Sequence, residues 1–252
     1  MRPLVVGIGC FVCLCPFPLY GELVYSNDFD SAAVDGSGIA TSISGGTGTG
    51  GGIAGGVTSS QGFDAFDGFG GDFWRITAPD DVLEFSITGV SPLGNVSTCF
   101  SLAMIDSWDG TSGTFGTDIL NIAILDGSTQ IAGFSEAYSS GNAPSTGVVN
   151  TVVQNTQLGF NTGDPFWMED GYHLCFDNLT VSTGNLRIQF WGSSGGTGSG
   201  FQGGDDESFA IDNLLVTNNI STVPEPGALS YVLLASLCLQ FRRRRTSAIT
   251  AN

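Results

Sequence analysis

Short apolar runs with a period of two residues recur through most of this 252-residue chain and constrain its fold more than any other feature. They are rich in Val, Ile, Phe, Thr and Trp, and clusters of Gly, Asn, Asp and Ser separate them. Such runs predict β-strands bounded by turns, whereas no stretch between the two ends of the chain has a convincing helical period. The predicted strands are Phe73–Thr77, Val82–Val90, Thr98–Asp106, Asp118–Leu125, Gln130–Tyr138, Val148–Asn155, Tyr172–Ser182, Leu186–Trp191 and Ser208–Thr217. About nine strands in one domain predict an all-β fold, a two-sheet antiparallel β-sandwich.

Three local patterns refine this prediction. In Val82–Ile87, the alternation of apolar residues with Glu84 and Ser86 is typical of a strand with one buried face. Thr183–Asn185, with its central Gly, predicts a hairpin turn between the strands on either side. Gly, Ser, Thr and Ala dominate the stretch from about 35 to 70, which we predict to be a loop region.

Acidic residues dominate the charge of the chain. There is no Lys, five of the seven Arg lie in the terminal segments, and 23 acidic residues between Glu22 and Val223 stand against only Arg75 and Arg187. This field would repel a phosphate backbone, so we predict that nucleic acid is not a partner. Cations are the natural partners. The alternative is that the acidity only keeps a Gly-rich exported protein soluble.

The N-terminus predicts export. Met1-Arg2 precedes a run from Leu4 to Leu19 that is apolar apart from Gly, Pro and Cys, which is typical of a secretory signal peptide. We place the signal peptide at 1–21, with cleavage after Gly21. The β-sandwich domain then extends over 22–218.

Export also bears on the six cysteines. Three lie in the signal peptide and one in the C-terminal segment, so the exported domain keeps Cys99 and Cys175. In an oxidising compartment such a pair most simply forms a disulfide. The bond would close a loop of about 75 residues and contribute roughly 3 to 4 kcal/mol. The alternative is two buried thiols.

The C-terminal segment has several parts in a fixed order. A linker at 219–223 leads to a Pro-Glu-Pro motif, an apolar run of 14 residues at 228–241 and a cluster of four Arg. The run is shorter than the roughly 20 residues of a membrane-spanning helix, and the Arg cluster would stay on the cytoplasmic side. The predicted processing residues are Pro224, Glu225, Pro226, Arg242, Arg243, Arg244 and Arg245. The alternative is a plain C-terminal membrane anchor.

This order of motif, apolar helix and Arg cluster over 224–246, with a tail at 247–252, resembles the PEP-CTERM sorting signal of Gram-negative bacteria that make exopolysaccharide. The resemblance implies an exosortase, a membrane protease or transpeptidase, as a partner that cuts near the Pro-Glu-Pro motif. The secretion machinery is a second implied partner. The chain would be tethered to the inner membrane during export and then reach the outer surface or the extracellular matrix.

The pattern of the domain resembles the concanavalin-like, jelly-roll domains that are common in proteins with this tail. The residues that carry the likeness are Ile105–Gly110, Asp118–Gly127 and Asp206–Leu214. In such domains an N-terminal strand, here around Asn27–Phe29, often lies beside the last strand.

No pattern for catalysis stands out. The single His173 has no second His at metal spacing, which argues against a zinc site or a His-based triad. Gly192–Gly196 has the letters of a nucleophile elbow but lacks the helix that the elbow requires. We therefore predict no catalytic residues and a protein that is not an enzyme.

Two acidic clusters predict calcium, which takes about six to eight oxygen ligands and suits an acidic extracellular protein. Their members are Asp106, Asp109 and Asp118 in the first, and Asp205, Asp206, Glu207 and Asp212 in the second. If the first strand returns beside the last, Asp28 and Asp30 would join the second cluster. The alternative is that these side chains begin turns by accepting hydrogen bonds from their own backbone.

A carbohydrate-binding face would need exposed aromatic rings beside polar groups. The candidates are Trp74, Trp108, Trp167, Tyr138 and Trp191. The alternative for each is a place in the sandwich core. Trp167 is the strongest candidate for contact with polysaccharide because its surroundings have the composition of a loop.

Together these features predict an exported, non-enzymatic protein of the cell surface or extracellular matrix, structural or adhesive in an exopolysaccharide-rich envelope. The alternative is a calcium-assisted carbohydrate-binding module. A third hypothesis is an extracellular glycoside hydrolase with its carboxylates on separate strands. Structural calcium is the one cofactor that we expect.

Overall fold

The computed structural model describes residues 21–45, 56–79, 81–92, 94–111, 116–160, 167–195, 200–203 and 206–219. These residues belong to one compact unit, Gly21–Ser221. Residues 1–20 of the predicted signal peptide, the processing residues and the predicted C-terminal apolar helix lie outside them. None of the helices in the described part is long and apolar enough to cross a membrane.

The described residues form β-strands almost throughout. The elements are β1 (Glu22–Asn27), β2 (Val34–Asp35), β3 (Ala40–Gly45), β4 (Gly56–Ser59), the 3-10 helix η1 (Gln61–Ala65), β5 (Asp72–Ile76), β6 (Leu83–Thr88), β7 (Asn95–Asp106), β8 (Thr117–Asp126), β9 (Thr129–Ala137), β10 (Val148–Thr156), β11 (Glu169–Thr180), β12 (Asn185–Gly195) and β13 (Glu207–Asn219). Each of the predicted strands corresponds to one of β5 to β13.

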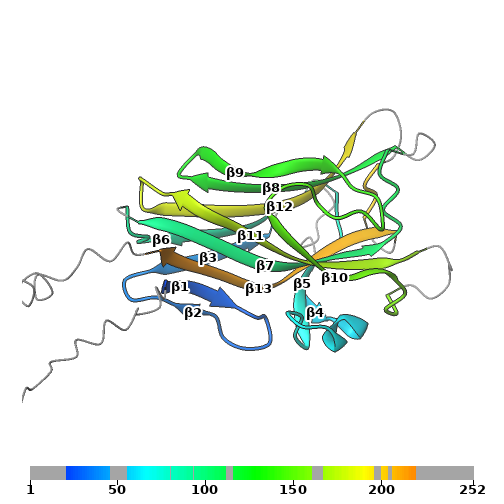
Figure 1. Cartoon of the computed structure of the whole chain (residues 1–252), viewed down its shortest axis with the longest axis horizontal. Coiled ribbons are helices and arrows are strands. Elements are labelled where there is room, and N and C mark those ends of the chain that lie inside the picture. The colour runs from blue at the N-terminus through cyan, green and yellow to red at the C-terminus, as the bar shows by residue number, and fades with distance from the viewer. Residues whose placement is uncertain are drawn as a thin grey trace, which may run out of the picture. The chain divides into compact units, whose positions relative to one another are not determined.

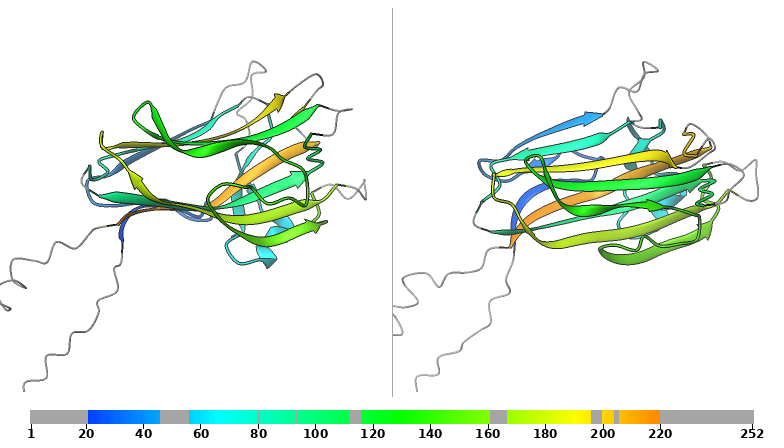
Figure 2. Two further views of the ribbon diagram at one scale, coloured as in Figure 1. Left: turned by 45° about the horizontal axis from the view of Figure 1, so that its top comes forward. Right: turned by 90° about the horizontal axis from the view of Figure 1, so that it is seen from above.

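The strands form two antiparallel sheets that lie face to face as two layers (Figures 1 and 2). In sheet A the order is β10-β11-β7-β13-β1-β2, and β5 pairs with both β13 and β4. In sheet B the order is β3-β6-β12-β8-β9. The predicted all-β, two-sheet fold is confirmed. The first strand lies beside the last, as predicted, with Asn27 opposite Leu214. The narrower concanavalin-like assignment stays a prediction.

One apolar core fills the space between the sheets, and alternation along each strand selects which side chains enter it. On β6, Leu83, Phe85 and Ile87 are buried, whereas Glu84 and Ser86 on the opposite face are partly exposed. This confirms the half-buried strand that the sequence predicted at this position.

The predicted loop region at 35–70 is wrong in part, because it contains β3, β4 and η1. These Gly-, Ser- and Thr-rich segments become strands because neighbouring strands offer them backbone partners: β3 pairs with β6, and β4 with β5. We call Gly56–Ile76, which holds β4, η1 and β5, the flap. Its Phe63, Phe69 and Phe73 belong to a second apolar cluster with Ala103 of β7 and Ala210 of β13.

The predicted hairpin at Thr183–Asn185 is also wrong. β11 belongs to sheet A and β12 to sheet B, so this segment crosses from one sheet to the other. The Asp126 carboxylate holds the crossing by accepting hydrogen bonds from the backbone N–H groups of Ser182 at 2.9 Å and Thr183 at 3.0 Å. A turn signal in sequence cannot distinguish a hairpin from a crossing between layers.

Cys99 and Cys175 lie directly opposite each other on β7 and β11 and form a disulfide. The bond confirms the predicted pairing and joins residues that are 76 positions apart.

Candidate metal centre

Three carboxylates from both predicted acidic clusters converge at one end of the sandwich. Asp109 follows β7, Asp118 lies at the start of β8, and Glu207 begins β13. One oxygen atom from each lies within 4.8 Å of the others. We call Asp109, Asp118 and Glu207 the acidic triad. It combines two members of the first predicted cluster with one member of the second, because β8 and β13 belong to different sheets that meet here.

The triad is largely buried. Asp118 is 2% exposed and Glu207 is 1% exposed, while Asp109 is half-buried. The Asp118 carboxylate accepts a hydrogen bond from the backbone N–H of Asp109 at 2.6 Å. Glu207 Oε2 accepts one from the backbone N–H of Gln202 at 2.6 Å. These bonds fix two of the three carboxylates in place.

Burial and neighbouring negative charges raise the pKa values of all three triad carboxyls. Burial raises the pKa of Glu207 to about 8, with a further rise from the charges of Asp118 and Asp206. Burial likewise raises the pKa of Asp118 to about 6, and burial and then Asp206 raise that of Asp109. Buried carboxylates beside one another are unfavourable unless protons or a cation compensate their charge.

Among the described residues, no Lys or Arg side chain forms an ion pair with the triad carboxylates. The chain has no Lys. Arg187 forms an ion pair with Glu84 at 2.5 Å, and Arg75 forms one with Asp106 at 3.6 Å. The donor set of the triad consists of carboxylate oxygens, the ligands that Ca²⁺ prefers.

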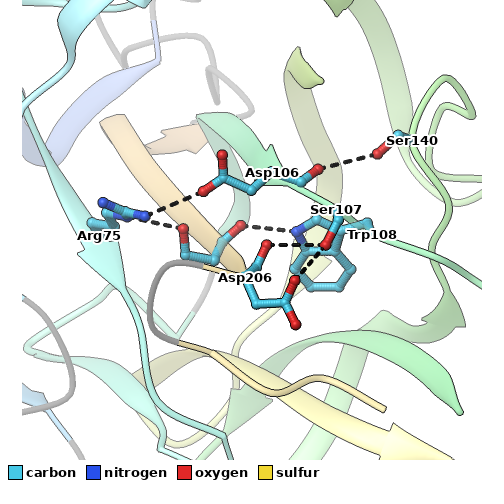
Figure 3. A network of polar contacts seen from close by, with 7 residues as sticks. Arg75, Asp106, Ser107, Trp108, Ser140 and Asp206 are labelled. Atoms are coloured by element: carbon cyan, nitrogen blue, oxygen red, sulfur yellow. Dashed lines mark hydrogen bonds and ion pairs between the residues drawn. The ribbon is translucent and has the colours of Figure 1, made fainter. Parts of the chain in front are cut away.

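Asp106 was predicted as a ligand, but it lies in a different polar network (Figure 3). Its carboxylate pairs with Arg75, whose Nε donates to Ser208 Oγ at 2.9 Å. The Trp108 indole N–H donates to the Ser208 carbonyl at 2.9 Å. Asp106 therefore holds the turn after β7 against β13, and it is not one of the three carboxylates that converge in the triad.

Asp206 lies at the margin of the triad. Its Oδ1 accepts a hydrogen bond from Ser107 Oγ at 2.7 Å (Figure 3), and its Oδ2 accepts one from Gln202 Nε2 at 2.9 Å. Its charge contributes to the raised pKa of every triad member. Asp205, the remaining predicted ligand at this end, lies outside the described residues.

Asp212, also a predicted ligand, is not part of the triad and holds the flap. Its Oδ2 accepts a hydrogen bond from the backbone N–H of Gly70 at 2.6 Å. Asp30 accepts bonds from the N–H groups of Gly71 at 2.9 Å and Asp72 at 2.5 Å. The expected proximity of Asp30 to Asp212 is thus present, but both carboxylates bind backbone N–H groups. Burial raises the pKa of Asp212 to about 6, and Asp30 and Asp28 add to the rise.

One alignment of polar residues on sheet A was not predicted from the sequence. Asp212, Ser101 and His173 are opposite one another on β13, β7 and β11. Ser101 Oγ lies 3.0 Å from His173 Nδ1, but the hydroxyl donates its proton to the carbonyl of Gly68 in the flap. The Ser101 hydroxyl therefore holds the flap against β7. Because Ser101 is only 1% exposed, its hydroxyl is not placed to act as a nucleophile. Only the pairing register of β7, β11 and β13 could have revealed this alignment.

The aromatic residues that were candidates for glycan contact differ in how deeply they are buried. Trp108 and Tyr138 are buried in the core, with their rings 5.5 Å apart. Trp74 is partly buried and packs against the same core. Trp167, the predicted glycan contact, is half-buried just before β11, and Trp191 is half-buried on β12. The role of Trp167 stays a prediction.

Comparisons with known proteins assign the chain to no family. No family model matches it, and no curated protein matches it.

One similar solved structure is the CBM27-1 module of Caldicellulosiruptor saccharolyticus in complex with mannohexaose, with a TM-score of 0.34 and 18% identity over 65% of this chain and 82% of that chain. Another is the enzymatically active domain of tailspike protein 4 from bacteriophage CBA120, with a TM-score of 0.31 and 18% identity over 72% of this chain. A third is a family 43 arabinoxylan arabinofuranohydrolase from Bacillus subtilis in complex with cellotetraose, with a TM-score of 0.26 and 13% identity over 58% of this chain. This chain spans only 19% of the tailspike chain and 21% of the arabinofuranohydrolase chain.

Proposed function

We propose that this chain is an exported, calcium-stabilised β-sandwich that serves as a structural or adhesive component of an exopolysaccharide-rich cell envelope and is not an enzyme. The observation that carries the proposal is the acidic triad. Three carboxylates within 4.8 Å of one another, two of them buried, have no Arg partner in the described part of a chain that lacks Lys.

The ligand atoms of the acidic triad and their position between the two sheets suit a calcium ion. Three carboxylates supply up to about six oxygens when they bind in bidentate fashion, and water or backbone carbonyls complete the shell. The ion would replace the protons that burial otherwise imposes on these groups. Because Asp118 and Glu207 come from different sheets, the ion would join the two layers at this end.

The C-terminal order of Pro224-Glu225-Pro226, apolar run and Arg cluster supports the export part of the proposal. Exosortase processing removes the Arg cluster after transient tethering to the inner membrane. Intact-mass spectrometry of the protein from its native host tests this step. A mass that lacks Arg242–Arg245 is expected, and a mass that still includes them would refute processing.

Incubation of the purified chain with soluble polysaccharides tests the non-enzymatic part. We expect no new reducing ends with calcium or with a chelator. Robust turnover would replace this proposal with the third hypothesis, an extracellular glycoside hydrolase. A calcium-assisted carbohydrate-binding module is the second candidate, and a specific surface of sheet B favours it.

A further inference from the structure

Trp191 lies on the outer face of sheet B, away from the core. Along β12, Leu186, Ile188 and Phe190 are fully buried, whereas the alternate residues Gln189 and Trp191 are half-buried. Trp191 belongs to neither apolar cluster. The Trp191 ring is half-buried on this face, so part of its apolar surface is accessible outside the core.

Polar side chains with fixed orientations lie beside this ring. Asn121 is opposite Trp191 on β8, and Ser135 is opposite Asn121 on β9. Asn121 Nδ2 donates to Ser193 Oγ at 2.8 Å, and Ser135 Oγ donates to Asn121 Oδ1 at 2.6 Å. Ser135 is exposed and Ser193 is half-buried, so both hydroxyls retain capacity for a ligand.

Two small residues lie in the next row of this face, beside Gln189. Ala123 lies opposite Gln189, and Gly133 lies opposite Ala123. Gly133 has φ of 113°, and a Cβ there would lie 2.1 Å from the carbonyl oxygen of Ile122. A larger side chain is therefore excluded at Gly133, so the β8 and β9 positions of this row, Ala123 and Gly133, carry no bulky group.

The same face is electrically neutral, unlike the molecule as a whole. Among the described residues of this face, the charged side chains are those of Glu84 and Arg187, which form an ion pair at 2.5 Å. Gln189 Nε2 also donates to Glu84 at 2.6 Å. The hydrogen bond from Arg187 is the largest of the influences that lower the pKa of Glu84 to about 2. Because the pair stays ionised and compensated at neutral pH, the face offers amide and hydroxyl groups around one aromatic ring.

We propose that the outer face of sheet B around Trp191 binds a neutral polysaccharide chain. The Trp191 ring stacks on the apolar face of one sugar, and Gln189, Ser135 and Ser193 exchange hydrogen bonds with hydroxyl groups of the chain. This inference rests on the proposed role in a polysaccharide-rich envelope, for which it supplies the contact surface. It assigns that contact to Trp191 in place of Trp167.

Affinity electrophoresis of the purified full chain tests the assignment. The gels contain hydroxyethylcellulose or galactomannan as neutral probes and alginate as an anionic probe. We expect the neutral polysaccharides to retard the wild type and alginate to have no effect. Trp191→Ala should weaken binding by at least about tenfold, because a stacked ring supplies much of the contact with a sugar. Trp191→Phe should retain part of the binding, and Trp167→Ala should bind as the wild type does.

Each other outcome overturns the assignment. If the wild type binds but Trp191→Ala binds equally well, the surface is wrong while the adhesive role stands. If only Trp167→Ala loses binding, the contact lies before β11. If the wild type binds none of the neutral probes, both the surface and the adhesive role fail, whereas the calcium and processing experiments remain independent. Unchanged thermal midpoints in the variants establish that lost binding does not reflect unfolding.

Discussion

Asp118 of sheet B and Glu207 of sheet A meet within 4.8 Å across the end of the sandwich. They are 2% and 1% exposed, and burial raises the pKa of each. Any cation that binds them therefore acts on the contact between the two layers as well as on local charge.

Calcium should raise the thermal midpoint of the metal-free protein. Ligand at 100 times its Kd adds about 2.7 kcal/mol of stability, which corresponds to roughly 5 to 10 °C for a domain of this size. Glu207→Gln should abolish the calcium shift and also raise the midpoint in chelator, because Gln is neutral without taking up the proton that burial imposes on Glu207 at neutral pH. Calorimetry with chelator and then with calcium measures both effects.

The exposed carboxylate Asp177 on β11 provides the matched control for that measurement. Asp177→Asn should keep the full calcium shift. Equal shifts in Glu207→Gln and Asp177→Asn would contradict a site at the triad.

The buried carboxyl of Asp212 should make stability depend on pH. Its folded pKa of about 6 lies above the ordinary value of 3.8. Its contribution is therefore fully present below the unfolded pKa and is lost as pH rises through the folded one. Relative to the wild type, Asp212→Asn should gain about 3 kcal/mol of unfolding free energy between acidic and neutral pH. Urea unfolding across this range measures the difference, and a difference that is independent of pH would be inconsistent with the raised pKa.

Gly68 allows the flap to approach His173. It has φ of 81°, and a Cβ there would lie 1.8 Å from His173 Cε1. Gly68→Ala should therefore destabilise the protein by roughly 2 to 4 kcal/mol. Gly141 is the control, because it has φ of 84° with nothing within 4 Å of its added Cβ. Gly141→Ala should lower the free energy of unfolding by only about 1 to 2 kcal/mol, the cost of a left-handed backbone conformation for Ala. If urea unfolding shows equal losses of stability for Gly68→Ala and Gly141→Ala, the close approach of Gly68 to His173 does not contribute.

The disulfide between Cys99 and Cys175 should stabilise the domain mainly by restricting the unfolded chain. Replacing both residues by Ser should cost roughly 3 to 4 kcal/mol for a loop of this length. A reducing agent should lower the midpoint of the wild type and leave that of the double variant unchanged. No loss of stability on reduction would mean that the bond adds nothing to the native state.

The sequence by itself determined where the long strands lie and which acidic residues are candidates for a cation site. Strands β5 to β13 follow from period-two alternation, because a half-buried strand must alternate apolar and polar side chains. The pairing of Cys99 with Cys175 also followed, since only two cysteines remain in the domain once the terminal segments are set aside. Neither inference required knowledge of which strands are neighbours.

Tertiary structure decided everything that depends on neighbours. The Gly-rich segments β3 and β4 are strands only because β6 and β5 supply hydrogen-bond partners. The turn signal near Gly184 joins two sheets because β11 and β12 pair with different strands. The acidic residues regroup for the same reason: Glu207 meets Asp118 across the layers, whereas Asp106 pairs with Arg75. Local sequence specifies the conformation of each strand, but the order of strands in the sheets decides which side chains meet.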